Sequence, residues 1–246
     1  MTKSGRKRLD LLMVEQGLAE SREQAQRMIM AGLVRVGEQV FDKPGKELPS
    51  ETVIRLEGED IPYVSRGGLK LEKALKVFDI DVAGKVAIDI GASTGGFTDC
   101  LLQHGVSRVY AVDVGYGQLH WKLRQDDRVI NIEKANIRYL DSEQISERID
   151  VAVIDVSFIS LKTVIPKVLE LLSADGIIVA LVKPQFEVGK GEVGKGGIVR
   201  EKDKHDKVLE DLSLFMSGQM LTVTGVTESP VLGAKGNREF LMALRR

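Results

Sequence analysis

The stretch from Val86 to Thr98 restricts the possible folds of this chain more than any other part of its sequence. Val86–Ile90 has the composition of a buried strand, and it runs directly into a bend that contains Gly91, Gly95 and Gly96. Glycines at such a strand–helix junction let a ligand approach the backbone closely and permit φ angles that other residues avoid. The spacing G-x-x-x-G-G differs from the G-x-G-x-x-G of nicotinamide dinucleotide sites, which disfavours that cofactor.

A carboxylate follows this bend at the interval that a nucleoside cofactor requires. Asp113 closes the next predicted strand, 22 residues after Gly91, where it can accept hydrogen bonds from both hydroxyls of a cofactor ribose. Asn136 and Glu133 follow the third predicted strand, where they either read an adenine edge or serve as ordinary loop polar residues. The bend and the acid together predict a nucleoside-type cofactor.

Strands and helices alternate through the larger part of the chain. A helix bearing Leu71 and Leu75 comes first, and two strands joined by a Pro/Gly-containing turn come last. The predicted strands are Val86–Ile90, Arg108–Asp113, Val129–Ile132, Asp150–Asp155, Gly176–Val182, Leu221–Glu228 and Glu239–Leu244. A helix is expected in each gap between the first five. This order predicts an α/β domain, a Rossmann-like and mostly parallel sheet that is covered on both faces and ends in an antiparallel hairpin.

A small α+β domain is predicted in front of this sheet, and it begins with two helices. The first ends near Gly17 and has an inward face of Leu9, Leu11, Leu12 and Val14. The second extends from the N-cap Ser21 to Met30 and stops at Gly32. Its inward residues are Ala25, Met28 and Ile29.

Short strands complete this small domain. They are predicted at Leu33–Val36 and Glu38–Val40, on either side of a turn at Gly37, and at Val53–Leu56. The pattern breaks at Gly58–Tyr63. We therefore predict a front domain at 1–60, a linker at 61–66 and the sheet domain at 67–246.

Four ionisable residues are predicted to meet at one rim of the sheet. Asp155 and Lys183 end the fourth and fifth strands, and ligands of such sheets bind outside the carboxyl ends of the strands. Glu239 begins the last, antiparallel strand at the same edge, and Lys70 lies early in the preceding helix. For any one of them alone, a surface ion pair is the commoner role. Their shared position favours a catalytic role, most firmly for Asp155 and Lys183.

This set of residues suits methylation of a ribose 2′-hydroxyl. The hydroxyl is a poor nucleophile until its proton is removed, and a lysine removes it only as a neutral amine, which partial burial or a neighbouring ammonium favours. Lys70 would place such a charge beside Lys183, while Asp155 and Glu239 would orient the amines. Amine methylation fits less well, because Asp155–Phe158 lacks the expected Asn/Asp-Pro-Pro-aromatic run.

Charge and cysteine content bear on the partner and the compartment. Met1–Lys46 carries nine Lys/Arg against six Asp/Glu, a modest basic excess in a chain of net charge −1. No apolar run could span a bilayer, and no signal-peptide core follows Met1–Asp10. The only cysteine, Cys100, lies in the helix behind the glycine bend, where a buried structural thiol is expected rather than a nucleophile for pyrimidine methylation. We expect a cytoplasmic protein with no membrane partner, disulfide or metal.

These residues resemble a known family. The order Lys70, Asp155, Lys183, Glu239 looks like the K-D-K-E tetrad of FtsJ-type ribose 2′-O-methyltransferases, and Asp89–Phe97 resembles their cofactor loop. The run Arg8-Leu-Asp-Leu-Leu, then Ser21-Arg22, Gly32-Leu-Val-Arg-Val-Gly and Lys43-Pro44, is similar to an S4-like RNA-binding domain. Joined through Ser65-Arg66-Gly67-Gly68, the two parts resemble the TlyA (hemolysin A-like) family along nearly the entire chain.

The resemblance implies a class I methyltransferase fold and methyl transfer from S-adenosylmethionine to a cytidine 2′-hydroxyl in 16S or 23S rRNA, as free RNA or in ribosomal subunits. It implies that Lys183 is the general base, which Lys70, Asp155 and Glu239 tune and orient. The implied cofactor residues are Gly91, Ala92, Ser93, Thr94, Gly95, Gly96, Phe97, Asp113 and Asn136. The candidate RNA contacts are Arg8, Arg22, Arg27, Lys43 and Arg66.

Three other functions compete with this hypothesis. A membrane-lysing hemolysin is disfavoured by the lack of a signal, spanning or strongly amphipathic segment. A catalytically silent RNA-binding protein is disfavoured by the intact tetrad, and a nicotinamide dehydrogenase by the glycine spacing. The sequence does not choose between a monomer and a homodimer.

Overall fold

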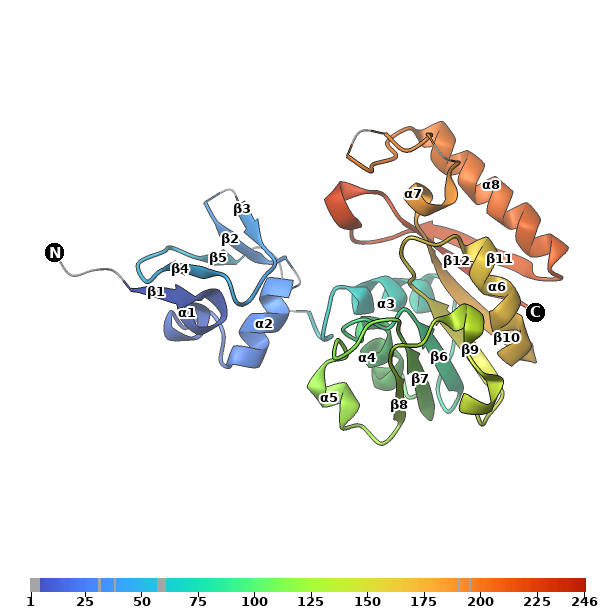
Figure 1. Ribbon diagram of the computed structural model, residues 1–246, viewed down its shortest axis with the longest axis horizontal. Coiled ribbons are helices and arrows are strands. Elements are labelled where there is room, and N and C mark those ends of the chain that lie inside the picture. Colours follow the sequence, from blue (N-terminus) through green and yellow to red (C-terminus); the bar gives the residue numbers. More distant parts are fainter. Residues whose placement is uncertain (1–4, 31, 38, 57–60, 190, 195) are drawn as a thin grey trace. The chain divides into compact units, whose positions relative to one another are not determined.

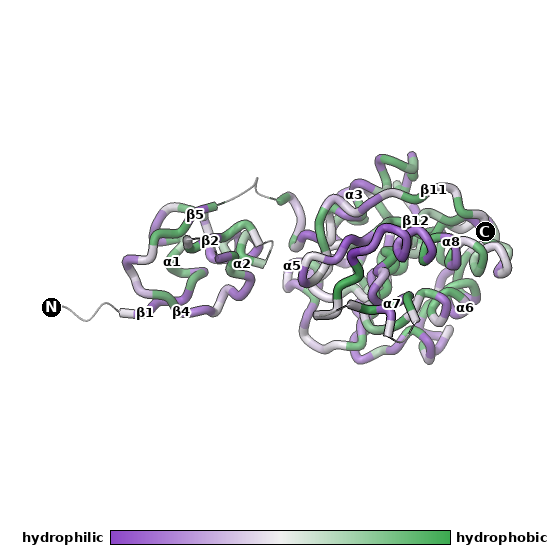
Figure 2. The backbone as a smooth tube through the Cα atoms, turned by 90° about the horizontal axis from the view of Figure 1, so that it is seen from above, coloured by the Kyte–Doolittle hydropathy of each residue, from purple (hydrophilic) through white to green (hydrophobic). Residues whose placement is uncertain are grey.

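The computed structural model describes residues 5–30, 32–37, 39–56, 61–189, 191–194 and 196–246. The chain divides into two compact units, Met1–Arg66 and Gly67–Arg246 (Figure 1). The predicted domain boundary is Gly58–Tyr63, and its residues 58–60 lie outside the described residues. The same holds for Glu38 of the predicted second strand. Hydrophobic and hydrophilic segments alternate along both units (Figure 2), as expected for two chains of elements that each bury one face.

The smaller unit is a mixed α+β unit with two short sheets. Its elements are β1 Arg6–Arg8, α1 Leu9–Glu15, α2 Arg22–Met30, β2 Val34–Val36, β3 Gln39–Phe41, β4 Glu47–Pro49 and β5 Arg55–Leu56. Strand β1 pairs with β4, and β2 lies between β3 and β5, all antiparallel. Residues of α1 and α2 pack with Val34, Leu48 and Ile54 into one hydrophobic core.

The second helix of this unit confirms its predicted limits. Ser21 Oγ accepts a hydrogen bond from Gln24 N at 3.1 Å, the geometry of an N-cap, and Gly32 has φ +73° at the other end. The predicted inward residues of α2 are buried. In α1 the prediction for Leu11 is wrong, because Leu11 is 40% exposed while Leu12 is buried. A helix turns by 100° per residue, so Leu11 lies nearly opposite Leu9.

The larger unit is an α/β unit. It begins with α3 Gly67–Val77, β6 Val86–Ile90, α4 Gly96–Gln103, β7 Arg108–Val112, α5 Trp121–Arg124 and β8 Val129–Ile132. Two single 3₁₀ turns follow, η1 Ile137–Tyr139 and η2 Ser142–Gln144, then β9 Ile149–Ile154, α6 Leu161–Leu171 and β10 Leu172–Val182. The last elements are α7 Pro184–Glu187, α8 Lys202–Gly218, β11 Thr222–Glu228, η3 Ala234–Gly236 and β12 Phe240–Arg245.

These strands form a sheet in the order β11-β12-β10-β9-β6-β7-β8. Strands β10, β9, β6, β7 and β8 are parallel, whereas β12 is antiparallel to both β10 and β11. The fold is therefore a Rossmann-like, mostly parallel sheet that ends in an antiparallel hairpin, as the sequence predicts. Because chain order reverses around β6, the carboxyl ends of β6 and β9 form the crevice where doubly wound sheets bind ligands.

Helices cover both faces of this sheet. On one face, alternate side chains of the strands, such as Ile88, Ala152 and Ile178, pack with buried residues of α6 and α8. Helices α6 and α8 lie side by side in Figure 1. Helices α3 and α4 pack on each other and contact β6, β7 and β12, whose remaining side chains point the other way.

Two predictions about helices are wrong. The gap between β8 and β9 contains no α-helix; Asn136 and Asp141 each cap a single 3₁₀ turn with a side-chain oxygen, and such local bonds compete with a continuous helix. The sequence interpretation also overlooked α8, whose inward residues His205, Val208, Leu212 and Met216 follow helical spacing in a mostly charged segment.

Candidate active site

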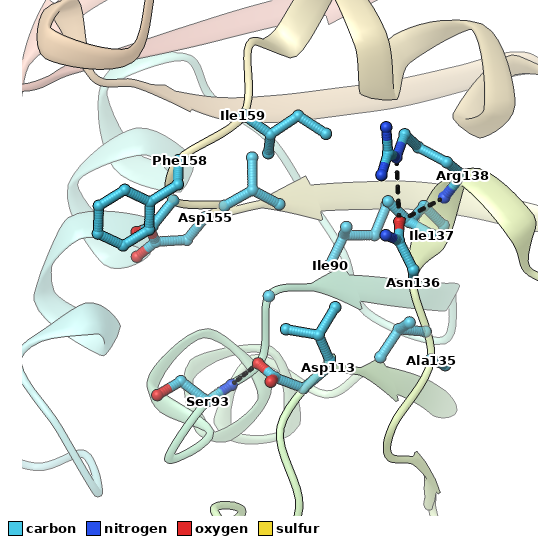
Figure 3. A pocket seen from close by; sticks show the side chains of 15 residues that line it. Ile90, Ser93, Asp113, Ala135, Asn136, Ile137, Arg138, Asp155, Phe158 and Ile159 are labelled. Atoms are coloured by element: carbon cyan, nitrogen blue, oxygen red, sulfur yellow. Dashed lines mark hydrogen bonds between the residues drawn. The ribbon is translucent and has the colours of Figure 1, made fainter.

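A cavity of about 470 Å³ opens at the carboxyl ends of the parallel strands, within the usual size range of ligand pockets (Figure 3). It is lined by Ile90, Gly91, Ser93, Val112, Asp113, Val114, Ala135, Asn136, Ile137, Arg138, Asp155, Val156, Ser157, Phe158 and Ile159. These residues follow β6, β7, β8 and β9. The cavity therefore occupies the crevice that the topology predicts.

The glycine bend contributes Gly91 and Ser93 to one wall of the cavity. Close contacts leave no room for a side chain at Gly91 or Gly95. Gly91 has φ +85°, and a Cβ at this position would overlap the backbone carbonyl oxygen of Asp155. Asp155 N also donates to Ile90 O at 2.9 Å, so the two chain segments are in direct contact. Gly95 has φ +95° and begins the turn into α4, where a Cβ would overlap the Leu123 side chain. Close packing of the bend on neighbouring segments therefore requires both glycines.

Asp113 lies beside this bend with its carboxylate at the cavity wall. Its Oδ2 accepts from Ser93 N at 2.8 Å and its Oδ1 accepts from Gly115 N at 2.6 Å. Two backbone donors hold the carboxylate in place, and each oxygen retains a further lone pair toward the cavity. Such a carboxylate can accept hydrogen bonds from a diol.

The polar residues after β8 divide between the cavity and the surface around it. Asn136 lines the cavity, and its Oδ1 accepts from Arg138 N at 3.1 Å, which leaves its amide NH₂ to donate (Figure 3). Glu133 is not among the lining residues; it forms an ion pair with Arg124, and a backbone hydrogen bond from Gly117 is the main cause of its lowered pKa. The geometry therefore favours Asn136 over Glu133 for contact with a ligand.

A buried acid beneath the glycine bend was overlooked in the sequence interpretation. Asp89 is fully buried, and its Oδ2 accepts from Thr98 N at 2.9 Å and from Thr98 Oγ1 at 2.7 Å. Its Oδ1 has no partner among the described atoms. The pKa of Asp89 is raised to about 7; burial is the largest cause, the hydrogen bonds from Thr98 oppose it, and the charges of Asp155 and Asp113 add to it. An acid within a strand that also starts a glycine bend was the available signal.

The four predicted catalytic residues form two lysine–acid pairs. Lys183 Nζ lies 2.6 Å from Asp155 Oδ1 and donates to Ser157 Oγ at 3.0 Å. Lys70 Nζ donates to Glu239 Oε2 at 2.6 Å. Both ammonium groups are mostly buried, with side-chain exposures of 11% for Lys183 and 12% for Lys70. Each lysine thus has its own acid, and Ser157 is a contact that the sequence interpretation overlooked.

The remaining predicted cofactor residues support the bend rather than line the cavity. Ala92 N donates to Val112 O at 3.2 Å, and Gly95 N donates to Ala92 O at 2.7 Å. Gly96 and Phe97 begin α4 and are buried. Thr94 O accepts from His120 N at 3.2 Å, which ties the bend to the segment before α5.

The smaller unit holds two of its predicted RNA contacts on one buried acid. Asp10 is fully buried and accepts from Arg8 Nε at 3.0 Å, from Arg22 Nε at 3.0 Å and from Gln26 Nε2 at 2.8 Å. These partners hold the pKa of Asp10 well below its usual range although burial opposes them. The Arg8 and Arg22 side chains are nevertheless about half exposed, so part of each remains accessible to a ligand.

The other three candidate RNA contacts lie apart from this cluster. Lys43 and Arg66 are exposed, and Arg27 is half-buried in the last turn of α2. Across the described part of the chain, no three His, Cys, Asp or Glu residues converge as metal ligands. Within the same residues no helix is both long and apolar enough to cross a membrane.

Comparison with known proteins matches both units of the chain. Residues 63–246 match the model of the FtsJ-like methyltransferase family, and residues 7–54 match the S4 domain. The Bacillus subtilis protein YqxC, named as a candidate rRNA methyltransferase, is 50% identical over 98% of this chain and 86% of its own length. The Mycobacterium tuberculosis 16S/23S rRNA (cytidine-2′-O)-methyltransferase TlyA is 45% identical over 98% of this chain and 90% of its own length.

A solved structure is similar over nearly the whole chain. It is a Streptococcus thermophilus protein named as a candidate hemolysin, with 50% identity and a TM-score of 0.78. The alignment covers 99% of this chain and 89% of that one. Relatives of this chain therefore carry both a methyltransferase name and a hemolysin name.

Proposed function

The chain belongs to the FtsJ-like methyltransferase family and carries an S4 domain in front, and we propose that it methylates a ribose 2′-hydroxyl of ribosomal RNA. The observation that carries this proposal is the pair of buried lysine–acid contacts, Lys183–Asp155 and Lys70–Glu239. Asp155 also lines the cavity beside the glycine bend, so chemistry and cofactor would meet there.

S-adenosylmethionine fits the residues around the cavity. Gly91 lines the cavity without a side chain, Asp113 offers carboxylate oxygens for the ribose diol, and Asn136 offers an amide donor for the base. Apolar side chains such as Ile137 and Ile159 line the rest. When bound, this cofactor supplies the electrophilic methyl group.

Lys183 is the proposed general base. A neutral amine nitrogen has two N–H bonds and one lone pair besides its carbon. Donation to Ser157 Oγ uses one N–H bond, and Asp155 Oδ1 lies 2.6 Å from the same nitrogen as its ion-pair partner. The lone pair would accept the proton of the substrate hydroxyl. Lys183 Nζ would take the proton of the ribose 2′-hydroxyl as the oxygen bonds to the methyl carbon. The carbon–sulfur bond of the sulfonium would break in the same step and leave a neutral thioether. Asp155 would stabilise the ammonium that results.

Lys70 and Glu239 are proposed to complete the site. Glu239 is almost fully buried, and Gly233 allows its position because a Cβ there would overlap the carboxylate. Lys70 Nζ would carry a fixed positive charge that stabilises the developing 2′-oxyanion. The acid and the glycine together hold that charge in place.

The substrate is inferred from the front unit and from the relatives. We propose 1–60 as the RNA-binding domain, 61–66 as a linker and 67–246 as the methyltransferase domain. In the front domain Arg8 and Arg22, fixed by Asp10, would contact phosphates, with Arg27, Lys43 and Arg66 as further contacts. The name of one relative suggests cytidine in 16S or 23S rRNA, and we propose a cytoplasmic location on the same ground.

The alternative is a hemolysin, the activity in the name of one similar structure. The lysine–acid pairs and the cofactor cavity give no advantage to a lytic protein but are what methyl transfer requires. A methyltransferase is therefore the better supported function.

Transfer of labelled methyl groups to purified ribosomal subunits tests the proposal. The parent chain should label RNA. Asp113→Ala should weaken cofactor binding about tenfold or more, because it removes a charge-assisted contact. Lys183→Ala should abolish transfer and leave cofactor affinity within about twofold, because its amine is not among the residues lining the cavity. Unchanged transfer by Lys183→Ala would exclude this lysine as the base.

A further inference from the structure

The proposed catalytic pair, Asp155 and Lys183, lies in the segments that follow β9 and β10, beyond the last residues that pair between these two strands. The last paired residues of β9 and β10 are Ile154 and Ala180. Asp155 and Lys183 both lie past this point. The ladder between β9 and β10 therefore ends before it reaches either of the two proposed catalytic side chains.

Glu187 connects these two segments. It lies at the end of α7, four residues after Lys183, and is partly buried. Its Oε2 accepts from Ser160 Oγ at 2.6 Å, and its Oε1 accepts from Leu161 N at 2.8 Å. Ser160 and Leu161 close the segment that starts at Asp155 and begin α6. One carboxylate thus ties the segment after Lys183 to the segment after Asp155.

An aromatic contact joins the same two segments. The rings of Phe158 and Phe186 lie 4.9 Å apart between centroids. Phe158 has φ +63°, an uncommon conformation for a bulky residue that the surrounding structure has to maintain. Ile159 and Val188, beside these residues, pack against the main hydrophobic core. The Glu187 hydrogen bonds and the Phe158–Phe186 contact therefore both join the two segments, and neighbouring residues of each segment pack on the hydrophobic core.

The hydrogen bond from Leu161 N to Glu187 stabilises the first turn of α6. Ser160 already caps it by accepting from Lys162 N at 3.1 Å, and Glu187 adds a carboxylate at Leu161 N, where the helix dipole favours negative charge. Pro166 lies inside α6 and cannot donate to the carbonyl one turn earlier, so the first turn is held less firmly by the helix itself.

We propose that Glu187 is a positioning residue that holds Lys183 at its working distance from Asp155. This inference rests on the proposed function, because it assigns Lys183 and Asp155 to the reaction. Glu187 acts through α7 and the Asp155 segment and does not touch the substrate. Burial raises the pKa of Glu187, and the hydrogen bonds from Ser160 and Leu161, which also fix the position of the carboxyl group, oppose that rise.

The first test measures the exposure of Lys183 directly and needs neither cofactor nor RNA. The full chain is pulsed with an amine-acetylating reagent, and peptide mass spectrometry gives the rates at Lys183 and Lys70. Lys70 is the internal control, since its amine is equally buried and ion-paired but lies far in sequence from Glu187. We expect Glu187→Ala to raise the Lys183 rate about threefold or more and to leave the Lys70 rate unchanged.

Two further variants keep this test decisive. Glu187→Gln retains an oxygen for Leu161 N and an NH₂ for Ser160 Oγ, so both rates should match the parent. Ser160→Ala removes one of the two bonds and should give an intermediate Lys183 rate; it answers the question if Glu187→Ala fails to fold. An unchanged Lys183 rate in Ser160→Ala and in any folded Glu187→Ala would overturn the proposal.

The second test separates positioning from stability. We expect Glu187→Ala to lower kcat about tenfold with a smaller change in KM, because small displacements of catalytic groups have large effects. Thr163→Gly weakens the same first turn of α6 without touching Glu187 and should leave kcat within about twofold. Equal loss in both variants at equal thermal stability would overturn the proposal. If the parent itself transfers no methyl group, the proposed function fails, while the acetylation rates still decide the role of Glu187.

Discussion

Replacing Asp89 by Asn should remove the pH dependence of stability that this buried acid imposes on the larger unit. Asn has the shape of the protonated acid, and its carbonyl oxygen can accept both hydrogen bonds from Thr98. Its NH₂ would occupy the place of Oδ1, which has no described partner. The substitution therefore removes ionisation and leaves the packing largely unchanged.

The size of the effect follows from the pKa of Asp89. A pKa raised from 3.8 to about 7 means that the folded state retains the proton more strongly than the unfolded state. The stability that this group contributes is complete below the unfolded pKa and is lost as the pH rises through about 7. The total is roughly 4 kcal/mol, of which roughly 3 kcal/mol falls between about pH 5 and pH 8.5.

Urea unfolding at several pH values measures this effect. The only tryptophan of the chain, Trp121, lies in the larger unit and reports its unfolding by fluorescence. The difference in unfolding free energy between Asp89→Asn and the parent should shift in favour of Asn by roughly 3 kcal/mol from about pH 5 to pH 8.5. Every other group titrates in both proteins and cancels from this difference.

Asp126→Asn is the matched control. The hydrogen bond from Arg128 lowers the pKa of Asp126 in the folded state. The stability that Asp126 contributes is therefore lost only as the pH falls below the pKa of Asp126 in the unfolded chain. The difference between this variant and the parent should therefore be flat across the same window. A flat difference for Asp89→Asn as well, or a shift in favour of the parent at high pH, would refute the reasoning about Asp89.

Three further substitutions have expected outcomes. Gly91→Ala combines a positive φ with overlap on the Asp155 carbonyl oxygen and should destabilise the larger unit by about 2 kcal/mol or more and abolish cofactor binding, as measured by calorimetric titration; normal binding would contradict this. Gly233→Ala would push the Glu239 carboxylate aside and should lower methyl transfer about tenfold in a folded protein, as seen in initial rates. Asp10→Ala leaves Arg8 and Arg22 without their acid and should destabilise the smaller unit by roughly 2 kcal/mol at neutral pH. The loss should be smaller in acid, where Asp10 of the parent loses its charge. Hydrogen exchange in the smaller unit measures the loss at each pH.

The sheet could be predicted because its strands are short apolar runs between clear breaks. The limits of β6 and β8 agree with the prediction, and the ends of β7, β9 and β10 place Asp113, Asp155 and Lys183 at one edge. Parallel strands buried on both faces leave few alternative assignments for such runs. The positions of Asp113, Asp155 and Lys183 at the strand ends could be predicted for the same reason, because they follow directly from where the strands end.

The elements that were overlooked depend on contacts that are remote in the sequence. Strand β1 is basic and exposed, and only its pairing with β4 makes it a strand. Helix α8 is largely charged and is held by one narrow apolar stripe. Between β8 and β9, side-chain caps at Asn136 and Asp141 replace the expected helix with isolated turns. Local propensity is a weak guide in all three places.

Within the site, residue types were easier to predict than their partners. The sequence interpretation expected Asp155 and Glu239 to orient the two amines, but it did not say which acid meets which lysine; the structure pairs Lys183 with Asp155 and Lys70 with Glu239, each at 2.6 Å. The effect of Lys70 on Lys183 stays a prediction. Asp10 lies within the run that resembles an S4-like domain, and Glu187 lies in no quoted motif; the role of each is visible only from the side chains that it binds. Pairings of this kind require the fold, since spacing in the sequence does not determine which side chains meet.

The chemical identity of the methylated product tests the central claim most directly. Ribosomal subunits are incubated with the chain and labelled S-adenosylmethionine, the RNA is digested to nucleosides, and the labelled nucleoside is fragmented in a mass spectrometer. The account predicts that the added methyl group stays with the ribose fragment and that Lys183→Ala abolishes the product. A methyl group on the base would contradict the roles of Lys183, Asp155, Lys70 and Glu239, and no label on any RNA would contradict the proposed function as a whole.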